Sequence, residues 1–213
     1  MEVFNWLSKT ITGQYPLVPV RSNVDGRTYK VRDLPDKQQA ADLLAKVRIQ
    51  LGKVCDALVR KFPDKPQVKR MRNNFLADPD RFLEATPDAK HTSYSVNKGE
   101  AIHLCLRQRR GADESLVGES VIMFVGLHEM AHTITQSIGH EPEFWNNFGW
   151  LLREAEALGL YKHQDFRAHP VAYCGVSITD QPRYDPARDE ERSASGSGLL
   201  DILRIGNVIE EKK

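Results

Sequence analysis

Three of the seven histidines of this 213-residue chain lie close together in one mostly apolar stretch. They are His128, His132 and His140, in LHEMAHTITQSIGHEPEFW (residues 127–145), and Glu129 stands directly after the first of them. Residues four apart on a helix lie on the same side, about one turn apart, so His128 and His132 can bind one cation together. Neutral imidazole suits Zn²⁺, and a neighbouring carboxylate can take a proton from water. The HExxH pattern therefore predicts a zinc site.

A third protein ligand must complete this pattern. A catalytic zinc site usually has three protein ligands and keeps a fourth position open. We expect His140 to be the third, because Gly139 can take the left-handed conformation that ends a helix and turns the chain back. The alternatives, as in sites with two histidines and one glutamate, are Glu143, Glu154 and Glu156.

The chemistry of such a site favours hydrolysis of a peptide bond. A bound zinc ion lowers the pKa of water from about 15.7 toward about 7 and polarises a carbonyl group. Glu129 is then expected to act as the general base, taking the proton of the water and passing it to the leaving amine. Tyr173, in HPVAYCG, is a candidate to hydrogen-bond the oxyanion, the alternative being an ordinary aromatic residue of a strand.

The elements that must position these groups follow from the spacing of apolar residues. Intervals of three and four predict a long helix over residues 36–62 and a second helix over 115–138, which carries the motif. Pro142 is expected to begin a third helix, whose Phe144 and Trp145 pack against the second and hold the third ligand in place. Alternating residues predict a β-hairpin over 92–107, and HPVAYCGVSI predicts a late strand.

The chain is long enough for one well-buried domain, and composition divides it into three parts. An N-terminal arm over residues 1–32 contains several turn-forming Gly and Pro residues. The catalytic domain is expected over residues 33–178. Residues 179–213 form a polar linker rich in Ser and Gly, followed by the apolar stretch LLDILRI, which could dock on a partner or on the domain itself.

Charge gives little support to nucleic acid or a membrane as a partner. Thirty Lys and Arg residues balance 29 Asp and Glu residues, so the formal net charge is +1. The basic clusters VKRMR (68–72) and RQRRG (107–111) could contact phosphate, but short clusters of this kind are usually solvated surface. No apolar run approaches the roughly 20 residues that cross a bilayer, so we expect no membrane association.

The cysteines and the N-terminus predict an intracellular protein, in the cytoplasm or the nucleus. Cys55, Cys105 and Cys174 are odd in number and form no CxxC pair, so we expect unpaired cysteines in a reducing compartment. The opening MEVFNWLSKT has no basic leader followed by a long apolar block, so it does not resemble a secretory signal.

The stretch HEMAHTITQSIGHEPEFW resembles the WLM and SprT-like branch of the zincin metallopeptidases, in which a third histidine and then an aromatic residue follow an HExxH helix. The resemblance implies an α+β fold with a zincin-like core, in which a small β-sheet packs on the motif helix and an edge strand receives the substrate. It also implies zinc ligation by His128, His132 and His140, with Glu129 as the general base. Similar predicted peptidases occur in large DNA viruses, so a virion-associated location is also expected.

Two departures from this family limit what the resemblance implies. The segment from His132 to His140 is longer than in the tightest patterns of the branch, and no ubiquitin-type or DNA-binding module is recognisable in the sequence. The best-known members cut proteins that are crosslinked to DNA, and this substrate is therefore not carried over to the chain.

We therefore predict an α+β zinc metallopeptidase, an endopeptidase acting on protein or peptide substrates. The alternative is a zincin-fold scaffold with little or no protease activity, held by its arm and tail in a larger assembly such as a virion or a DNA-repair complex. A third interpretation needs no zinc, because buried histidines are often hydrogen-bonded core residues.

Overall fold

The computed structural model describes residues 15–109 and 114–187 of the chain. The strands are β1 (Leu17–Arg21), β2 (Thr28–Arg32), β3 (Phe82–Glu84), β4 (Tyr94–Val96), β5 (Ala101–Leu104), β6 (Val171–Tyr173) and β7 (Val176–Ile178). The helices are α2 (Lys37–Lys61), α3 (Pro66–Asn74), the 3₁₀ turn η1 (Pro79–Arg81), α4 (Glu119–Ile134) and α5 (Pro142–Ala157). The predicted α+β class, with a long helix ahead of the helix that carries the motif, is confirmed.

Five strands form one mixed sheet in the order β1-β2-β3-β5-β4. β2, β3 and β5 are parallel, whereas β1 and β4 are antiparallel to their neighbours. In this order β1 and β4 are the two edge strands. The predicted hairpin over 92–107 is confirmed as β4 and β5, with Tyr94 opposite His103. Residues 17–32, which the sequence assigns to an arm, form β1 and β2 of this sheet.

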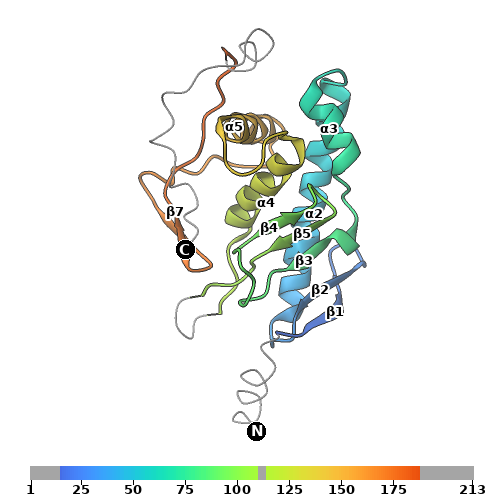
Figure 1. Ribbon diagram of the computed structural model, residues 1–213. Helices are drawn as coiled ribbons and strands as arrows, with labels where there is room; N and C mark the ends of the chain where they lie inside the picture. The colour runs from blue at the N-terminus through green and yellow to red at the C-terminus, as the bar shows by residue number, and fades with distance from the viewer. Residues whose placement is uncertain (1–14, 110–113, 188–213) are drawn as a thin grey trace.

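Helix α2 covers one face of the sheet, and α4 lies beside it, between α2 and α5 (Figure 1). The buried residues of α2 recur at intervals of three and four, among them Leu44, Val47, Leu51 and Val54, as expected for a helix with one apolar face. A Cβ atom on Gly126 of α4 would lie 3.0 Å from the Val47 side chain, so a glycine lets the two helices pack closely.

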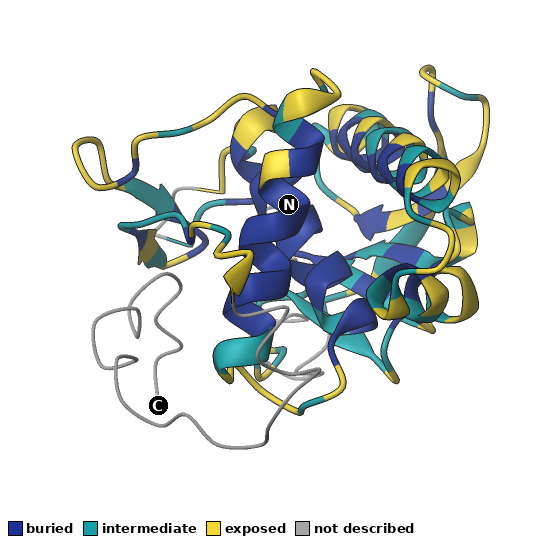
Figure 2. Ribbon diagram, turned by 90° about the horizontal axis from the view of Figure 1, so that it is seen from above, coloured by how far each residue is buried: buried dark blue, intermediate teal, exposed yellow. Residues whose placement is uncertain are grey.

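Helix α4 is buried on nearly all sides. Thirteen of its residues are buried, and it contacts α2, α3, α5, β4 and β5. Figure 2 shows that buried residues concentrate in the central helices, whereas exposed residues lie in the outer loops. No helix in the described part of the chain combines the length and the hydropathy that a membrane span requires.

The prediction of a helix over 115–138 was too long at both ends. Leu116 instead pairs with Arg107 in an isolated β-bridge, and the helix begins after Gly118. At the other end Thr135 is extended, and its hydroxyl donates to the carbonyl of Ala131. Local hydrogen bonds therefore outweigh the apolar periodicity at each end.

Residues 179–187 run along α5 rather than away from it. A Cβ atom on Gly149 of α5 would lie 2.7 Å from the carbonyl carbon of Arg183, so the segment packs against the helix at a position where the helix has no side chain. The backbone N–H of Asp185 donates to Asn146 Oδ1, and the Arg153 guanidinium lies over the ring of Tyr184. The apolar stretch LLDILRI lies outside the described residues.

The expectation of unpaired cysteines is wrong for two of the three. Cys105, just after β5, and Cys174, in the turn between β6 and β7, form a disulfide with their Cα atoms 6.4 Å apart, whereas Cys55 is free. Cys174 and Gly175 both have positive φ, +48° and +91°, as a two-residue hairpin turn requires. The pairing joins residues 69 apart in sequence, so it depends on the fold and not on local spacing.

We predict that Cys174→Ser lowers the free energy of unfolding by about 2–5 kcal/mol, because the disulfide limits the unfolded chain over a long loop. Urea denaturation without reductant measures the change. Cys55→Ser is the matched control and should cost about 1 kcal/mol or less. Equal unfolding midpoints for Cys174→Ser and the wild type would contradict the prediction.

Candidate metal centre

The three histidines of the motif meet at one point. His128 and His132 come from one side of α4, and their Nε2 atoms lie 3.3 Å apart. His140 Nε2 lies 3.1 Å from His128 Nε2, and one ligand atom from each ring lies within 4.8 Å of the others. Tetrahedral ligands about 2.0–2.1 Å from one zinc ion are about 3.3–3.4 Å apart. The three rings could therefore hold a metal ion together, and the described residues contain no second such group.

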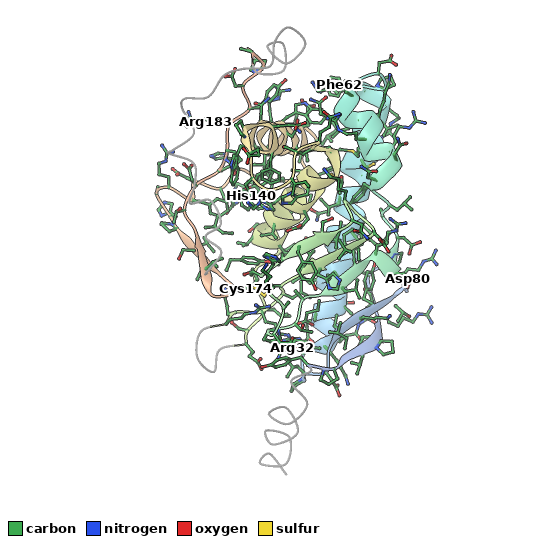
Figure 3. The ribbon with its side chains drawn as sticks, viewed as in Figure 1. Arg32, Phe62, Asp80, His140, Cys174 and Arg183 are labelled. Atoms are coloured by element: carbon green, nitrogen blue, oxygen red, sulfur yellow. A yellow bond between two sulfur atoms is a disulfide. The ribbon has the colours of Figure 1, made fainter. Side chains whose placement is uncertain are left out.

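The turn between α4 and α5 brings His140 to the other two rings. Gly139 has φ +82°, and no atom lies within 4 Å of the position that a Cβ would occupy. The left-handed backbone, and not lack of space, therefore favours glycine there. Pro142 stands in the first turn of α5, as predicted. In Figure 3, His140 lies where α4 and α5 come together.

One aromatic ring of α5 contacts all three imidazoles. The centroid of Phe144 lies 4.3 Å from that of His132, in a stacked arrangement, 4.8 Å from that of His128 and 4.7 Å from that of His140. Trp145 lies 5.4 Å from His140. The prediction that Phe144 and Trp145 pack against the motif is confirmed, and this packing limits how the rings can turn.

Burial favours the neutral form of His128 and His132. Burial lowers the pKa of His128 well below its usual 6.5, and the charges of His132 and His140 add to the effect. Burial also lowers the pKa of His132 to about 3, with smaller contributions from the charges of His140 and Lys98. A neutral imidazole has a free nitrogen lone pair, which is the form that binds a metal cation.

Glu129 and Tyr173 are both buried. Glu129 follows His128 on α4 and is 2% exposed, and Tyr173 comes from β6 and is 1% exposed. The Tyr173 hydroxyl lies 2.6 Å from Ser93 Oγ, which also accepts from the backbone N–H of Cys105. Burial raises the pKa of Tyr173, and the charge of Glu129 contributes to the rise. The fold thus brings these two groups, 44 residues apart in sequence, into electrostatic contact.

Glu143, one of the alternative third ligands, is used to hold the backbone. Its carboxylate accepts from the N–H groups of Gln136 and Ser137 at 3.2 and 3.1 Å. It also lies 3.7 Å from a guanidinium nitrogen of Arg70. The third position of the cluster belongs to His140.

The other two alternatives lie further along α5 and have other partners. Glu154 accepts from Lys61 and Arg153, each at 2.7 Å. Glu156 lies 3.3 Å from the ring of His163. Neither carboxylate belongs to the histidine cluster.

Sequence reasoning missed two cations that reach the end of α4. Lys98 comes from the turn between β4 and β5, and its Nζ donates to backbone carbonyls after α4. Arg70 comes from α3 and donates to the carbonyl of Ile134. The only local signal was the turn pattern Asn-Lys-Gly at residues 97–99, which says nothing about what the turn contacts.

We predict that Phe144→Ala lowers the free energy of unfolding of the metal-free protein by about 3–5 kcal/mol, because it leaves a cavity against three rings. Urea denaturation measures the loss. Ile138→Ala is the control, since Ile138 is apolar, close in sequence and 89% exposed, and it should change stability by about 0.5 kcal/mol or less. Similar losses in both variants would show that Phe144 does not pack as described.

The lowered histidine pKa values predict that the metal-free protein loses stability in acid. Unfolded histidines titrate near pH 6.5, whereas His128 and His132 resist protonation in the folded state. Below about pH 6.5 the unfolded chain therefore binds more protons, so stability falls as the pH falls toward about 3. Urea midpoints between pH 7.5 and 5, with chelator present, measure the slope. A slope no shallower in His132→Gln would contradict this origin.

Proteins of known sequence and structure resemble the chain to different extents. No family model matches it. It is 33% identical over 165 residues to the uncharacterized protein R325 of Acanthamoeba polyphaga mimivirus, a match that covers 76% of this chain and 82% of that protein. It is 36% identical over 69 residues to the uncharacterized protein 136R of Invertebrate iridescent virus 6, which covers 32% of this chain and 38% of that protein.

Among solved structures, the chain is similar to a crystal structure of a mutant of Wss1 from Saccharomyces cerevisiae. The TM-score is 0.43 and the sequence identity 23%, over 62% of this chain and 92% of that chain. A second structure of Wss1 gives the same TM-score and identity, over 61% of this chain and 89% of that chain. The match to R325 is more extensive in sequence and spans most of both proteins. The chain therefore belongs to the same protein family as R325 of the mimivirus.

Proposed function

We propose that this chain is a zinc-dependent metallopeptidase that hydrolyses internal peptide bonds of proteins. The observation that carries the proposal is the meeting of three imidazoles, with Nε2 atoms 3.1 and 3.3 Å apart, next in sequence to the buried carboxylate of Glu129. The likeness of the HExxH stretch and its third histidine to the WLM and SprT-like zincins supports the same conclusion.

The ligand set favours zinc over other common cations. Magnesium and calcium prefer oxygen ligands, and the described cluster consists of three imidazole nitrogens. Three protein ligands also leave one tetrahedral position open, as in catalytic rather than structural zinc sites. When bound, zinc would act as a Lewis acid toward the substrate carbonyl and would lower the pKa of water toward about 7.

Glu129 is proposed to move the proton. Its carboxylate lies on the same helix as two of the ligands, one residue after His128, and is buried where bulk water does not compete for it. It would accept a proton from the attacking water and pass it to the nitrogen of the leaving amine. In this role it binds no metal, so its removal affects catalysis and not ligation.

Tyr173 is proposed to donate a hydrogen bond to the oxyanion that forms on the substrate carbonyl. Burial raises its pKa, so the phenol keeps its proton at neutral pH and can donate it. Its hydroxyl is paired with Ser93 Oγ at 2.6 Å, and either oxygen can be the donor. A substrate carbonyl would have to compete with Ser93 for the Tyr173 hydroxyl.

An extended protein segment is the proposed substrate. β4 lies at the edge of the sheet, pairs with β5 alone among the described residues, and contacts α4. A peptide can add to such an edge through main-chain hydrogen bonds. These bonds require an extended peptide backbone but do not depend on the identity of its side chains. The viral relatives agree with an intracellular or virion-associated place of action, which stays part of this proposal.

We predict that Glu129→Gln keeps zinc but lowers cleavage at least about 100-fold, because the amide cannot accept the proton. His132→Ala should lose both zinc and cleavage. Zinc content by elemental analysis and cleavage of a peptide library provide the two measurements, and Glu156→Gln, outside the cluster, is the control that should cleave normally.

The outcomes separate the proposed enzyme from the alternatives. Cleavage by Glu129→Gln at the wild-type rate would refute the role of this residue. Wild-type protein that binds zinc and cleaves nothing would instead favour a scaffold in a larger assembly. Wild-type protein without affinity for zinc would favour a core that needs no metal.

A further inference from the structure

We infer that Lys98 positions the third metal ligand by holding the ligand loop, residues 135–139, which joins α4 to His140. The inference rests on the proposed metal site but concerns a residue outside it. Lys98 belongs to the turn between β4 and β5, and no pattern around the HExxH motif includes it.

The first observation is a set of three contacts from one ammonium group. Lys98 Nζ donates to the carbonyls of Thr135, Gln136 and Ser137, at 2.5, 3.0 and 3.4 Å. These carbonyls follow the last turn of α4 and have no partner within the helix. The end of a helix carries partial negative charge, so a cation with three donors suits this place.

The second observation is the backbone of the turn that carries Lys98. Asn97, Lys98 and Gly99 all have positive φ, at +44°, +55° and +116°. Such a conformation is uncommon for lysine, so the surrounding structure must hold it. A Cβ atom on Gly99 would lie 2.5 Å from the carbonyl oxygen of Asn74, so the turn packs directly on the end of α3. This contact aims the lysine at the ligand loop.

The third observation is an anion that holds the same loop from its N–H side. Glu143, in the first turn of α5, accepts from the N–H groups of Gln136 and Ser137. Lys98 binds the carbonyl groups of these two residues. The loop is therefore held between a cation from the sheet and an anion from α5, on the path from His132 to His140.

Positioning and charge act in opposite directions on metal affinity. The Lys98 ammonium binds the backbone directly after the helix that carries His132, so its positive charge would also repel a cation held by the cluster. Loss of this charge alone would tighten metal binding. Loss of the three contacts to the loop would instead free His140 and weaken binding. The sign of the change in a variant therefore identifies which effect dominates.

The test uses Lys98→Met, which keeps an unbranched chain and removes the ammonium. Metal-free protein is titrated with Zn²⁺ in competition with a chromophoric chelator, and Co²⁺ is added separately to record the visible absorption of its site. We expect zinc affinity to fall about 10- to 100-fold, the usual loss when a group that orients a ligand is removed. The Co²⁺ absorption of a tetrahedral site should weaken as well.

Two further variants make the result specific. Lys98→Arg should restore most of the affinity, because a guanidinium can donate to the same carbonyls. Lys46→Met is the matched control, since Lys46 tethers the other end of α4 through Glu119 at 2.9 Å, and it should leave affinity within about twofold. If Lys98→Met does not fold by circular dichroism, Lys98→Gln replaces it, with the same expected direction.

Zinc affinity that is unchanged or tighter in the folded Lys98 variant would overturn the inference and leave the proposed peptidase intact. The same holds if Lys98→Arg fails to restore affinity. Wild-type protein that binds no zinc would overturn both. Wild-type protein that binds zinc but cleaves no peptide would count against the proposed function alone, because the measured quantity here is affinity.

Discussion

The structure depends on bringing three imidazoles close together near the end of a buried helix, with His128 and His132 kept unprotonated by burial. Like charges 3 Å apart would repel, so the cluster is stable only while the rings are neutral or share a cation. Burial provides the first condition for His128 and His132, because it disfavours the charged forms of these two rings, and Phe144 packs against both. The same burial leaves nitrogen lone pairs directed at one point, which is what a cation requires. Folding and metal binding therefore both favour neutral, closely spaced imidazoles in this part of the chain.

Elements from several parts of the chain support the helix that carries the site. α2 packs on it through Gly126, and α5 supplies the aromatic ring that contacts all three histidines. Arg70 from α3 and Lys98 from the turn between β4 and β5 donate hydrogen bonds to the backbone carbonyls where the helix ends. A buried helix end without such partners would cost free energy at each unpaired carbonyl. These two side chains therefore provide hydrogen-bond donors for the carbonyls at the helix end, and they also position the loop that leads to His140.

The short β6–β7 hairpin shows how a weak element can still present a functional group. Two strands of three residues do not form a stable unit alone. The hairpin is attached through the Cys105–Cys174 disulfide and through Gln108, whose side chain donates to the carbonyl of Ala172 and accepts from the N–H of Cys174. Tyr173 lies next to the disulfide, so these attachments determine where its hydroxyl lies relative to Ser93 and Glu129.

The sequence by itself determined the helices with strong periodicity, the β4–β5 hairpin and the meeting of His128, His132 and His140, because four-residue spacing, Gly139 and Pro142 act locally. It favoured His140 as the third ligand but left Glu143, Glu154 and Glu156 as alternatives, since the partners of these carboxylates depend on how α5 packs. The disulfide, the contact between Tyr173 and Ser93, and the contacts of Lys98 with the loop after α4 were decided by the tertiary structure alone. Each of these joins segments far apart in sequence, and only the packed fold brings their atoms within bonding distance.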